Sequence, residues 1–297
     1  FSFGVVLFLY LLIKKAPTKT IVQLSPLPVG FIAVLATQIK RKKIVVNISD
    51  LWPKAGLEMG LLKPGLYYRI LEKMERFCYA KSCLILGQSQ EILTHAARIV
   101  PEKNVLLYRN LNPHPTSVDV RPKHRANIRL FYAGLIGVAQ GFAHLLPQIK
   151  LPKNIELHLF GDGPEKIAVA TQVQKIPRCF YHGSLSKIEL YKRIVAFDAA
   201  FVPLRQRIYG SVPSKIFEYS AMGMPILYFS EGEGADLVSK HYLGICTSSM
   251  DALNTILKQL SEEKIKFPNK AEVYKNAQQA FDFDAQIRLL IKQLKRL

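Results

Sequence analysis

The sequence has 297 residues, 49% of them hydrophobic and 21% charged, a composition that excludes an intrinsically disordered chain and allows two domains of ordinary size. The formal net charge is +19, and residues 1–130 carry most of it, with 20 Lys and Arg against 7 Asp and Glu. This excess suits an anionic membrane surface, a phosphorylated substrate or nucleic acid. No nucleic-acid-binding motif accompanies it, and the KRKK run at 40–43 is typical of a solvated loop, so we expect no nucleic-acid partner.

The chain opens with a mostly apolar stretch, FSFGVVLFLYLLI, that ends at Lys14 and Lys15. This stretch is shorter than the roughly 18–20 apolar residues of a membrane span, and no small-residue cleavage site follows it. We predict an amphipathic or buried helix here. Because the chain starts without Met inside apolar sequence, we also expect the natural N-terminus to lie upstream.

The first half alternates strand-like apolar runs with helix-like segments. Strands are predicted at 21–25, 44–49, 83–87 and 105–110, and helices near 29–39, 66–80 and 89–99. A polar, proline-rich stretch follows at 112–125. We therefore predict a first Rossmann-like domain at 1–115, incomplete at its start, and an interdomain linker at 116–127.

The second half shows the same alternation more regularly. Strands are predicted at 128–133, 155–160, 179–182, 198–204, 225–229 and 244–247, with helices near 140–149, 164–173, 186–196, 214–222, 233–241 and 250–261. This alternation predicts a parallel sheet covered on both faces, which binds ligands outside the carboxyl ends of its strands. We place this second domain at 128–280 and a C-terminal helix at 281–297.

Glycine-containing turns follow three of these strands, as GLIG at 134–137, GDGP at 161–164 and GS at 183–184. Glycine lets a backbone approach a ligand closely, although any one of these turns alone is ordinary helix or turn punctuation. Their recurrence at consecutive strand ends favours one nucleotide-sized site.

The stretch SVPSKIFEYSAMGMP at 211–225 places a carboxylate, Glu218, in a short apolar helix. Ser214 is a plausible N-cap, and Gly223 with Pro225 ends the run. A buried carboxylate is costly unless something hydrogen-bonds to it. Glu218 therefore either pairs with a neighbour such as Lys215 or binds a ligand.

Taken in order, these motifs resemble retaining family 4 glycosyltransferases of the GT-B fold. DLWPKAGLEMGLLK at 50–63 also resembles a narrower bacterial group that transfers sugars, often N-acetylated amino sugars, to lipid-linked acceptors for O-antigen or capsule. The resemblance covers the chain from about residue 20. It implies an α/β, GT-B architecture, two Rossmann-like domains facing across a cleft with the first incomplete, and retaining transfer from a nucleoside-diphosphate sugar, by family habit UDP.

The resemblance assigns Glu218 to the ribose hydroxyls of the donor, and Lys215 with Arg205 or Arg207 to its diphosphate. The implied donor-binding set is Glu218, Lys215, Ser214, Arg205, Gly134, Gly161, Gly163, His182 and Gly183, with His182 offering backbone groups rather than its ring to the base. The sequence departs from the family at Gly210, where an earlier sugar-contacting glutamate is expected. The family's basic pair after the first strand of this domain is also absent, and Leu135, Ile136 and Gln140 occupy that region.

Asp50 follows the strand-like IVVNIS and is the candidate catalytic residue, either orienting the acceptor hydroxyl or acting as a base. A loop or N-cap role for Asp50 is the open alternative, and Glu58 is expected to be a solvated helix residue. The remaining histidines, His95 and His158 among them, show no partner pattern and are expected to be structural or exposed. No cofactor and no metal are expected, because no DxD-type pair has the right context and the four cysteines, expected as buried thiols, form no CxxC pair.

The basic first half and the segment 66–81, which mixes aromatic, Leu and cationic residues, favour an anionic membrane surface as a partner, beside the nucleotide sugar and a lipid-diphosphate-linked acceptor. Residues 66–81 fit a solvated helix equally well. We expect a cytoplasmic protein, peripheral on the inner face of the cell membrane. A non-catalytic GT-B scaffold subunit and a UDP-sugar epimerase or hydrolase remain alternatives.

Overall fold

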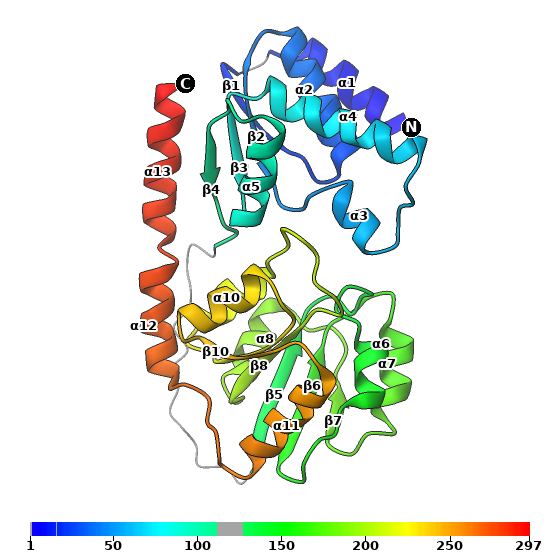
Figure 1. Ribbon diagram of the computed structural model, residues 1–297, viewed down its shortest axis with the longest axis vertical. Helices are drawn as coiled ribbons and strands as arrows, with labels where there is room; N and C mark the ends of the chain where they lie inside the picture. The colour runs from blue at the N-terminus through cyan, green and yellow to red at the C-terminus, as the bar shows by residue number, and fades with distance from the viewer. Residues whose placement is uncertain (1, 16, 112–126) are drawn as a thin grey trace. The chain divides into compact units, whose positions relative to one another are not determined.

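The computed structural model describes residues 2–15, 17–111 and 127–297, which form two compact units, each built on a parallel sheet (Figure 1). The first unit comprises residues 1–110, 208–212 and 284–297, and the second comprises 111–207 and 213–283. Residues 116–126 of the predicted linker lie outside the described part of the chain. Residues 208–212, which lie in the chain between β8 (Ala199–Pro203) and α9 (Ser214–Ser220) of the second unit, thus belong to the first unit. No sequence pattern indicated this.

The first sheet has the strand order β1–β2–β3–β4. All its pairs are parallel, with Ile21 opposite Val45 and Val46 opposite Ile85. The strand bounds are β1 Lys19–Gln23, β2 Lys43–Ile48, β3 Leu84–Gly87 and β4 Val105–Leu107. Each predicted strand of this half is confirmed, although β4 ends three residues early.

Both faces of the first sheet are covered by helices. Successive strand residues point to opposite faces, so each face has its own set of packed side chains. Ile44, Val46 and Ile48 belong to the larger core, which they share with α2 (Leu27–Ile39), α4 (Leu66–Lys81) and α5 (Gln90–Ile99). Val45 and Leu86 point the other way and pack with Leu290 of the C-terminal helix α13 (Phe283–Arg296). The predicted terminal helix therefore closes the second face of the first sheet.

A buried polar cluster lies beneath α4. Glu75 is only 4% exposed, and its Oε1 accepts a hydrogen bond from the Tyr79 hydroxyl at 2.8 Å and lies 3.0 Å from His95 Nε2. His95 therefore has a structural role, with a partner that no sequence pattern indicated. These contacts compensate the cost of burying the Glu75 carboxylate.

Two further helices belong to the first unit. Helix α1 (Ser2–Ile13) packs against α2 and was predicted to be amphipathic or buried. It is instead apolar on its exposed side too, where Val5, Val6, Leu9, Tyr10 and Ile13 face solvent. Helix α3 (Lys54–Glu58) is a single short turn that the sequence patterns did not predict.

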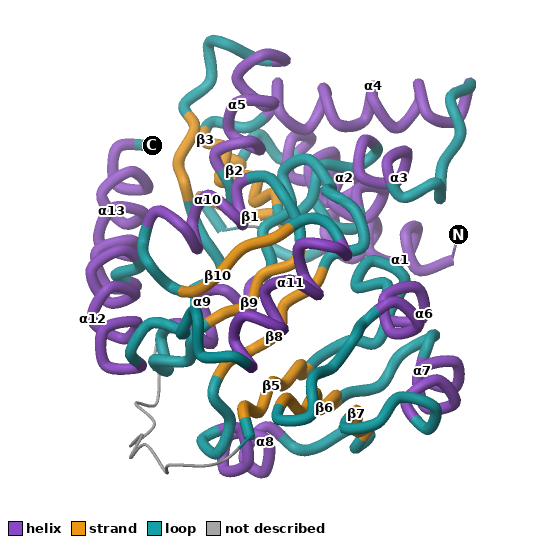
Figure 2. Tube along the Cα trace, turned by 60° about the horizontal axis from the view of Figure 1, so that its bottom comes forward, coloured by secondary structure: helices purple, strands orange, loops and turns teal. Residues whose placement is uncertain are grey.

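The second sheet has the order β10–β9–β8–β5–β6–β7, all parallel (Figure 2). The strands are β5 Ile128–Ala133, β6 Ile155–Phe160, β7 Cys179–Tyr181, β8 Ala199–Pro203, β9 Ile226–Phe229 and β10 Gly244–Thr247. All six were predicted. Strand order reverses beside β5, because the chain runs from β5 to β6 and β7 and then returns to β8 on the other side of β5.

The helices of the second unit cover both faces of this sheet (Figure 1). They are α6 Phe142–Leu145, η1 Leu146–Gln148, α7 Lys166–Val173, α8 Lys187–Ile194, α9 Ser214–Ser220, α10 Glu233–Lys240, α11 Met250–Ser261 and α12 Lys270–Ala280. The helix predicted at 140–149 is shorter, since Gly141 precedes it in a left-handed conformation and Pro147 interrupts it. Helix α12 was not predicted.

Candidate functional site

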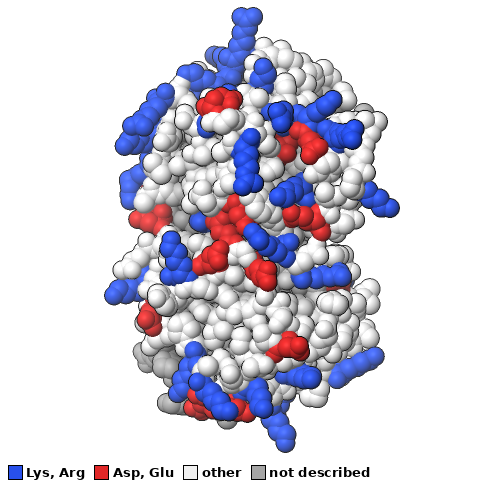
Figure 3. Space-filling model, in the orientation of Figure 1, with Lys and Arg blue, Asp and Glu red and all other residues white. Residues whose placement is uncertain are grey.

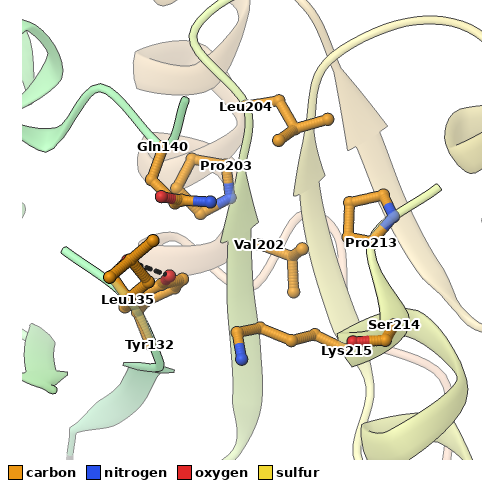
Figure 4. Close-up of a pocket in the computed structure, with 9 residues that line it drawn as sticks. All are labelled: Tyr132, Leu135, Gln140, Val202, Pro203, Leu204, Pro213, Ser214 and Lys215. Atoms are coloured by element: carbon orange, nitrogen blue, oxygen red, sulfur yellow. Dashed lines mark hydrogen bonds between the residues drawn. The ribbon is translucent and has the colours of Figure 1, made fainter. Parts of the chain in front are cut away.

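The candidate site of the second unit is a cavity of about 230 Å³ at the carboxyl ends of β5 and β8 (Figure 4). These two neighbouring strands flank the point where strand order reverses, which is where open parallel sheets bind ligands. Typical pockets for whole small ligands measure roughly 300–1,000 Å³, so this cavity encloses part of a nucleotide-sized ligand. It is lined by Tyr132, Leu135, Gln140, Val202, Pro203, Leu204, Pro213, Ser214 and Lys215.

Lys215 is the cation of this cavity. Its side chain runs past Gly134, where an added Cβ would lie 2.4 Å from Lys215 Cε, so Gly134 leaves space for the lysine. In Figure 4 the amine points toward Tyr132, and its Nζ lies 5.7 Å from the centre of that ring. Burial lowers the pKa of Lys215 below its ordinary 10.5, and the charge of Glu218 acts in the opposite direction. A half-buried cation at a cavity edge can bind an anionic group.

Two buried tyrosines fix the elements around Lys215. The Tyr132 hydroxyl donates a 2.6 Å hydrogen bond to the Leu135 carbonyl, which holds the loop after β5. The Tyr219 hydroxyl donates to the Ala133 carbonyl at 2.8 Å and thereby ties α9 to the end of β5. The β5 loop and α9 are therefore held rigidly at the cavity, as a preorganised site requires.

Glu218 lies one turn after Lys215 on α9 and is half-buried. Its Oε1 accepts a 2.8 Å hydrogen bond from the Tyr191 hydroxyl of α8. The alternative in which Glu218 forms an ion pair with Lys215 is not observed among the described residues. The predicted N-cap is wrong, because Pro213 occupies that position and Ser214 is the first helical residue, exposed at the cavity. Pro213 has a φ of −58° and a ψ of 124°, outside the helical region, so the helix starts one residue earlier than a Ser214 cap implies.

The strand-end glycines pack the second unit's loops against one another. A Cβ on Gly161 would lie 1.8 Å from the Gly134 carbonyl oxygen, and one on Gly163 would lie 2.4 Å from the Ile136 oxygen. Gly183 differs, since no atom lies within 4 Å of its added Cβ. Of these glycines, Gly134, Gly161 and Gly163 are therefore explained by contacts inside the protein, and only Gly183 faces open space.

His182 joins a buried network through its ring. Its Nε2 lies 2.9 Å from Nδ1 of His158, whose Nε2 lies 3.2 Å from Glu156. The His182 ring also stacks on Phe160, while its backbone N–H donates to the Leu159 carbonyl within the sheet. The expectation that His182 offers its backbone groups to a ligand is therefore wrong for the N–H, which the sheet uses, and stays a prediction for the carbonyl. His158, 7% exposed, is a structural histidine whose partners no sequence pattern indicated.

Two residues near the cavity behave differently from expectation. Arg205 is exposed, lies over Gly141 and does not line the cavity. Gln140, which sequence reasoning did not select, does line it. The buried Gln140 Oε1 has no hydrogen-bond partner among the described residues, so it is available to a ligand. Its sequence signals were its position three residues after the GLIG turn and its place in the region where the family's basic pair is absent.

The candidate residue of the first unit, Asp50, lies two residues beyond the end of β2. Burial raises the pKa of its carboxyl group above the ordinary 3.8. Helix α3 begins after Pro53 without a side-chain cap, so the N-cap alternative for Asp50 is wrong. A carboxylate at a strand end with a raised pKa is suited to accept a proton.

Segment 208–212, which carries Gly210, is anchored within the first unit. The Tyr209 amide donates to Glu58 at 2.8 Å, and the Gly210 amide donates to Glu91 at 2.6 Å. Ser89 Oγ in turn donates to the Gly210 carbonyl at 2.8 Å. Glu58 is therefore not the solvated residue we predicted. The position expected for a sugar-contacting glutamate is instead a glycine, which Glu91 and Ser89 hold through its backbone.

The described residues contain no group of three or more His, Cys, Asp or Glu side chains placed to hold a metal ion. Cys78 and Cys179 are buried thiols, whereas Cys83 and Cys246 are half-buried, and none of the four forms a disulfide. The thiols therefore carry no assigned chemistry.

Comparisons with known proteins address the sequence family and the fold. Residues 128–263 match the family model described as glycosyl transferases group 1. No curated protein matches the chain. Among solved structures, HepE of Anabaena in complex with UDP superposes with a TM-score of 0.67 at 16% identity, covering 90% of this chain and 76% of HepE.

Two further solved structures show the same likeness. TarM superposes with a TM-score of 0.72 at 13% identity over 97% of this chain and 57% of TarM. The lipopolysaccharide outer core galactosyltransferase WaaB gives 0.69 at 14% identity over 99% and 79%. The chain thus has the GT-B fold of these structures, and residues 128–263 of its second unit match the sequence pattern of the glycosyl transferases group 1.

Proposed function

We propose that the protein is a retaining glycosyltransferase that moves a hexose from UDP-sugar to a lipid-linked saccharide of a bacterial surface polysaccharide such as O-antigen or capsule. The observation that carries this proposal is the cavity at the strand-order reversal, with Lys215 inside it and Glu218 one turn further along α9. UDP and UDP-glucose complexes of HepE support the donor class. WaaB, a lipopolysaccharide galactosyltransferase, supports the acceptor class.

In this proposal the two α9 side chains divide the donor between them. The Lys215 ammonium neutralises the diphosphate, because an ion pair with a phosphate oxygen is strongest where water is excluded. The Glu218 carboxylate accepts hydrogen bonds from the ribose hydroxyls, since it has acceptor capacity beyond its bond to Tyr191. Ser214 adds a hydroxyl at the cavity edge.

For the chemistry, the bond between the sugar's anomeric carbon and the diphosphate oxygen breaks, and a bond to the acceptor oxygen forms on the same face. Lys215 stabilises the negative charge on the leaving diphosphate. Asp50 is our candidate to orient the acceptor hydroxyl or to take its proton. We propose that no metal takes part, so that EDTA leaves turnover unchanged.

We further propose that the first unit binds an anionic membrane from the cytoplasmic side. Helix α1 exposes apolar side chains, and Lys14 and Lys15 follow it directly. Helix α4 exposes Leu66, Tyr67 and Ile70 in the same unit. Apolar side chains beside lysines are typical of interfacial helices. No helix of the described ranges combines the length and apolar character of a membrane span. On the face seen in Figure 3, Lys and Arg are scattered rather than gathered in one block.

The test of the donor site is calorimetric titration of UDP, GDP, ADP and CMP into the wild type and into Glu218→Ala. We expect selective UDP binding that the substitution weakens by about 1–3 kcal/mol. Chromatography of UDP-N-acetylhexosamine reactions, with and without lipid-linked acceptor, then separates a transferase from a hydrolase or epimerase. Selective UDP binding without any turnover would favour the scaffold alternative, and a folded protein that binds no nucleotide would overturn the donor site.

A further inference from the structure

The Glu218 carboxylate is held from outside its own helix. Tyr191 lies on α8, 27 residues earlier in the chain, and its hydroxyl reaches Glu218 Oε1 at 2.8 Å. A glutamate side chain has several rotatable bonds, so a single fixed partner removes much of the freedom that binding a ligand would otherwise cost.

The direction of this hydrogen bond is defined. An ionised carboxylate only accepts hydrogen bonds, so the Tyr191 hydroxyl is the donor. Burial, with the neighbouring Glu218 charge, raises the pKa of Tyr191 above its ordinary 10.0, so the phenol keeps its proton at any physiological pH. Tyr191 therefore saturates one acceptor direction of Oε1 and leaves Oε2 to other donors.

The position of Tyr191 is itself well defined. Helix α8 begins with a complete capping box, in which Ser186 Oγ accepts from the Glu189 amide and Glu189 bonds back to Ser186. Lys187, one turn before Tyr191, places its Nζ 5.4 Å from the centre of the tyrosine ring. The capping box stabilises the start of the helix, and the Lys187 contact lies against the tyrosine ring itself.

We propose that Tyr191 is a positioning residue that orients the Glu218 carboxylate and thereby sets how strongly the protein distinguishes nucleotides with ribose hydroxyls from nucleotides without them. The inference rests on the proposed donor function, because it assigns the ribose as the ligand of Glu218. Tyr191 does not contact the ligand in this account. Its effect reaches the ribose only through the carboxylate.

The experiment compares the affinities of UDP and 2′,3′-dideoxy-UDP for the wild type and for Tyr191→Phe. A hydrogen bond to a charged group contributes roughly a 10- to 150-fold preference, so we expect the wild type to prefer UDP by at least about tenfold. In Tyr191→Phe we expect this preference to fall at least about threefold, with the affinity for dideoxy-UDP unchanged. In Glu218→Ala the preference should disappear.

Ser186→Ala is the matched control, because it weakens the start of α8 without removing the Tyr191 hydroxyl. We expect it to lower the melting temperature and to keep the wild-type preference. A Tyr191→Phe protein with the full wild-type preference would overturn the positioning role while leaving the donor site intact. A wild type without any preference for UDP over dideoxy-UDP would instead overturn the ribose assignment of Glu218. If Ser186→Ala reduced the preference as much as Tyr191→Phe, the effect would belong to α8 as a whole and the proposal would be wrong.

Discussion

Gly161→Ala tests the packing of the strand-end loops that form the second unit's cavity. Gly161 has a φ of +139°, which side-chain-bearing residues rarely adopt, and its new Cβ would lie 1.8 Å from the Gly134 carbonyl oxygen. Real contacts of this kind begin near 3.0 Å, so the two loops must separate by about 1.2 Å. That movement would stretch the 3.0 Å hydrogen bond from the Gly134 amide to the Phe160 carbonyl beyond a useful length.

The magnitude follows from two costs. Backbone strain at such a position costs about 1–3 kcal/mol, and forced overpacking costs about 1–3 kcal/mol more. We therefore expect Gly161→Ala to lose about 2–6 kcal/mol of folding free energy. The control is Gly183→Ala, whose φ of +69° is also positive but whose Cβ would meet nothing within 4 Å, so that only about 1 kcal/mol is lost.

Thermal unfolding measures both variants against the wild type. For a domain of this size about 1 kcal/mol corresponds to roughly 2–4 °C, so we expect a drop of about 4–24 °C for Gly161→Ala and about 2–4 °C for Gly183→Ala. UDP affinity should fall with Gly161→Ala, because the loop after β5 lines the cavity. Equal losses of stability in the two variants would refute the close approach of Gly161 to Gly134.

Three other substitutions or conditions give separate predictions. Lys215→Met should weaken UDP binding by about 10- to 150-fold and leave uridine binding unchanged in calorimetry, because uridine lacks the phosphates that the amine would bind. Glu91→Ala should cost about 1.5–3 kcal/mol in urea unfolding and speed proteolysis around Gly210, since it removes the 2.6 Å acceptor of that amide. Burial lowers the pKa values of His158 and His182 below 6.5 in the folded protein, so the unfolded chain binds protons more readily and stability should fall as the pH drops from 7 to 5. That fall should be smaller in His158→Gln, and an unchanged pH dependence there would contradict the assignment.

The strands of both sheets follow directly from the sequence, because apolar runs of four to six residues between polar segments indicate buried parallel strands. The elements that escaped prediction lack such a pattern. Helix α3 is one turn containing Gly56, and α12, KAEVYKNAQQA, buries only Val273 and Ala277. Two buried apolar residues in an otherwise polar segment are too few to show the hydrophobic period of a helix.

Contacts between site residues that are far apart in the sequence were harder to predict than the strands. Nothing near Glu218 in sequence points to Tyr191, since their contact depends on how α8 and α9 lie over the same sheet. The pair His158 and His182 could have been predicted, because parallel register places Phe180 opposite His158, and His182, directly after β7, is the next residue on the same face as Phe180. The sequence indicated that the strand-end glycines allow a close approach to the backbone. For Gly161 and Gly163 the group that approaches is another loop of the protein and not a ligand.

The most direct test of the donor site is the crystal structure of this protein with UDP. The account predicts UDP at the carboxyl ends of β5 and β8, with ribose hydroxyls about 2.5–3.0 Å from Glu218 and a diphosphate oxygen about 2.7–2.9 Å from Lys215 Nζ. UDP bound elsewhere, or bound at this cavity with its ribose turned away from Glu218, would contradict the account.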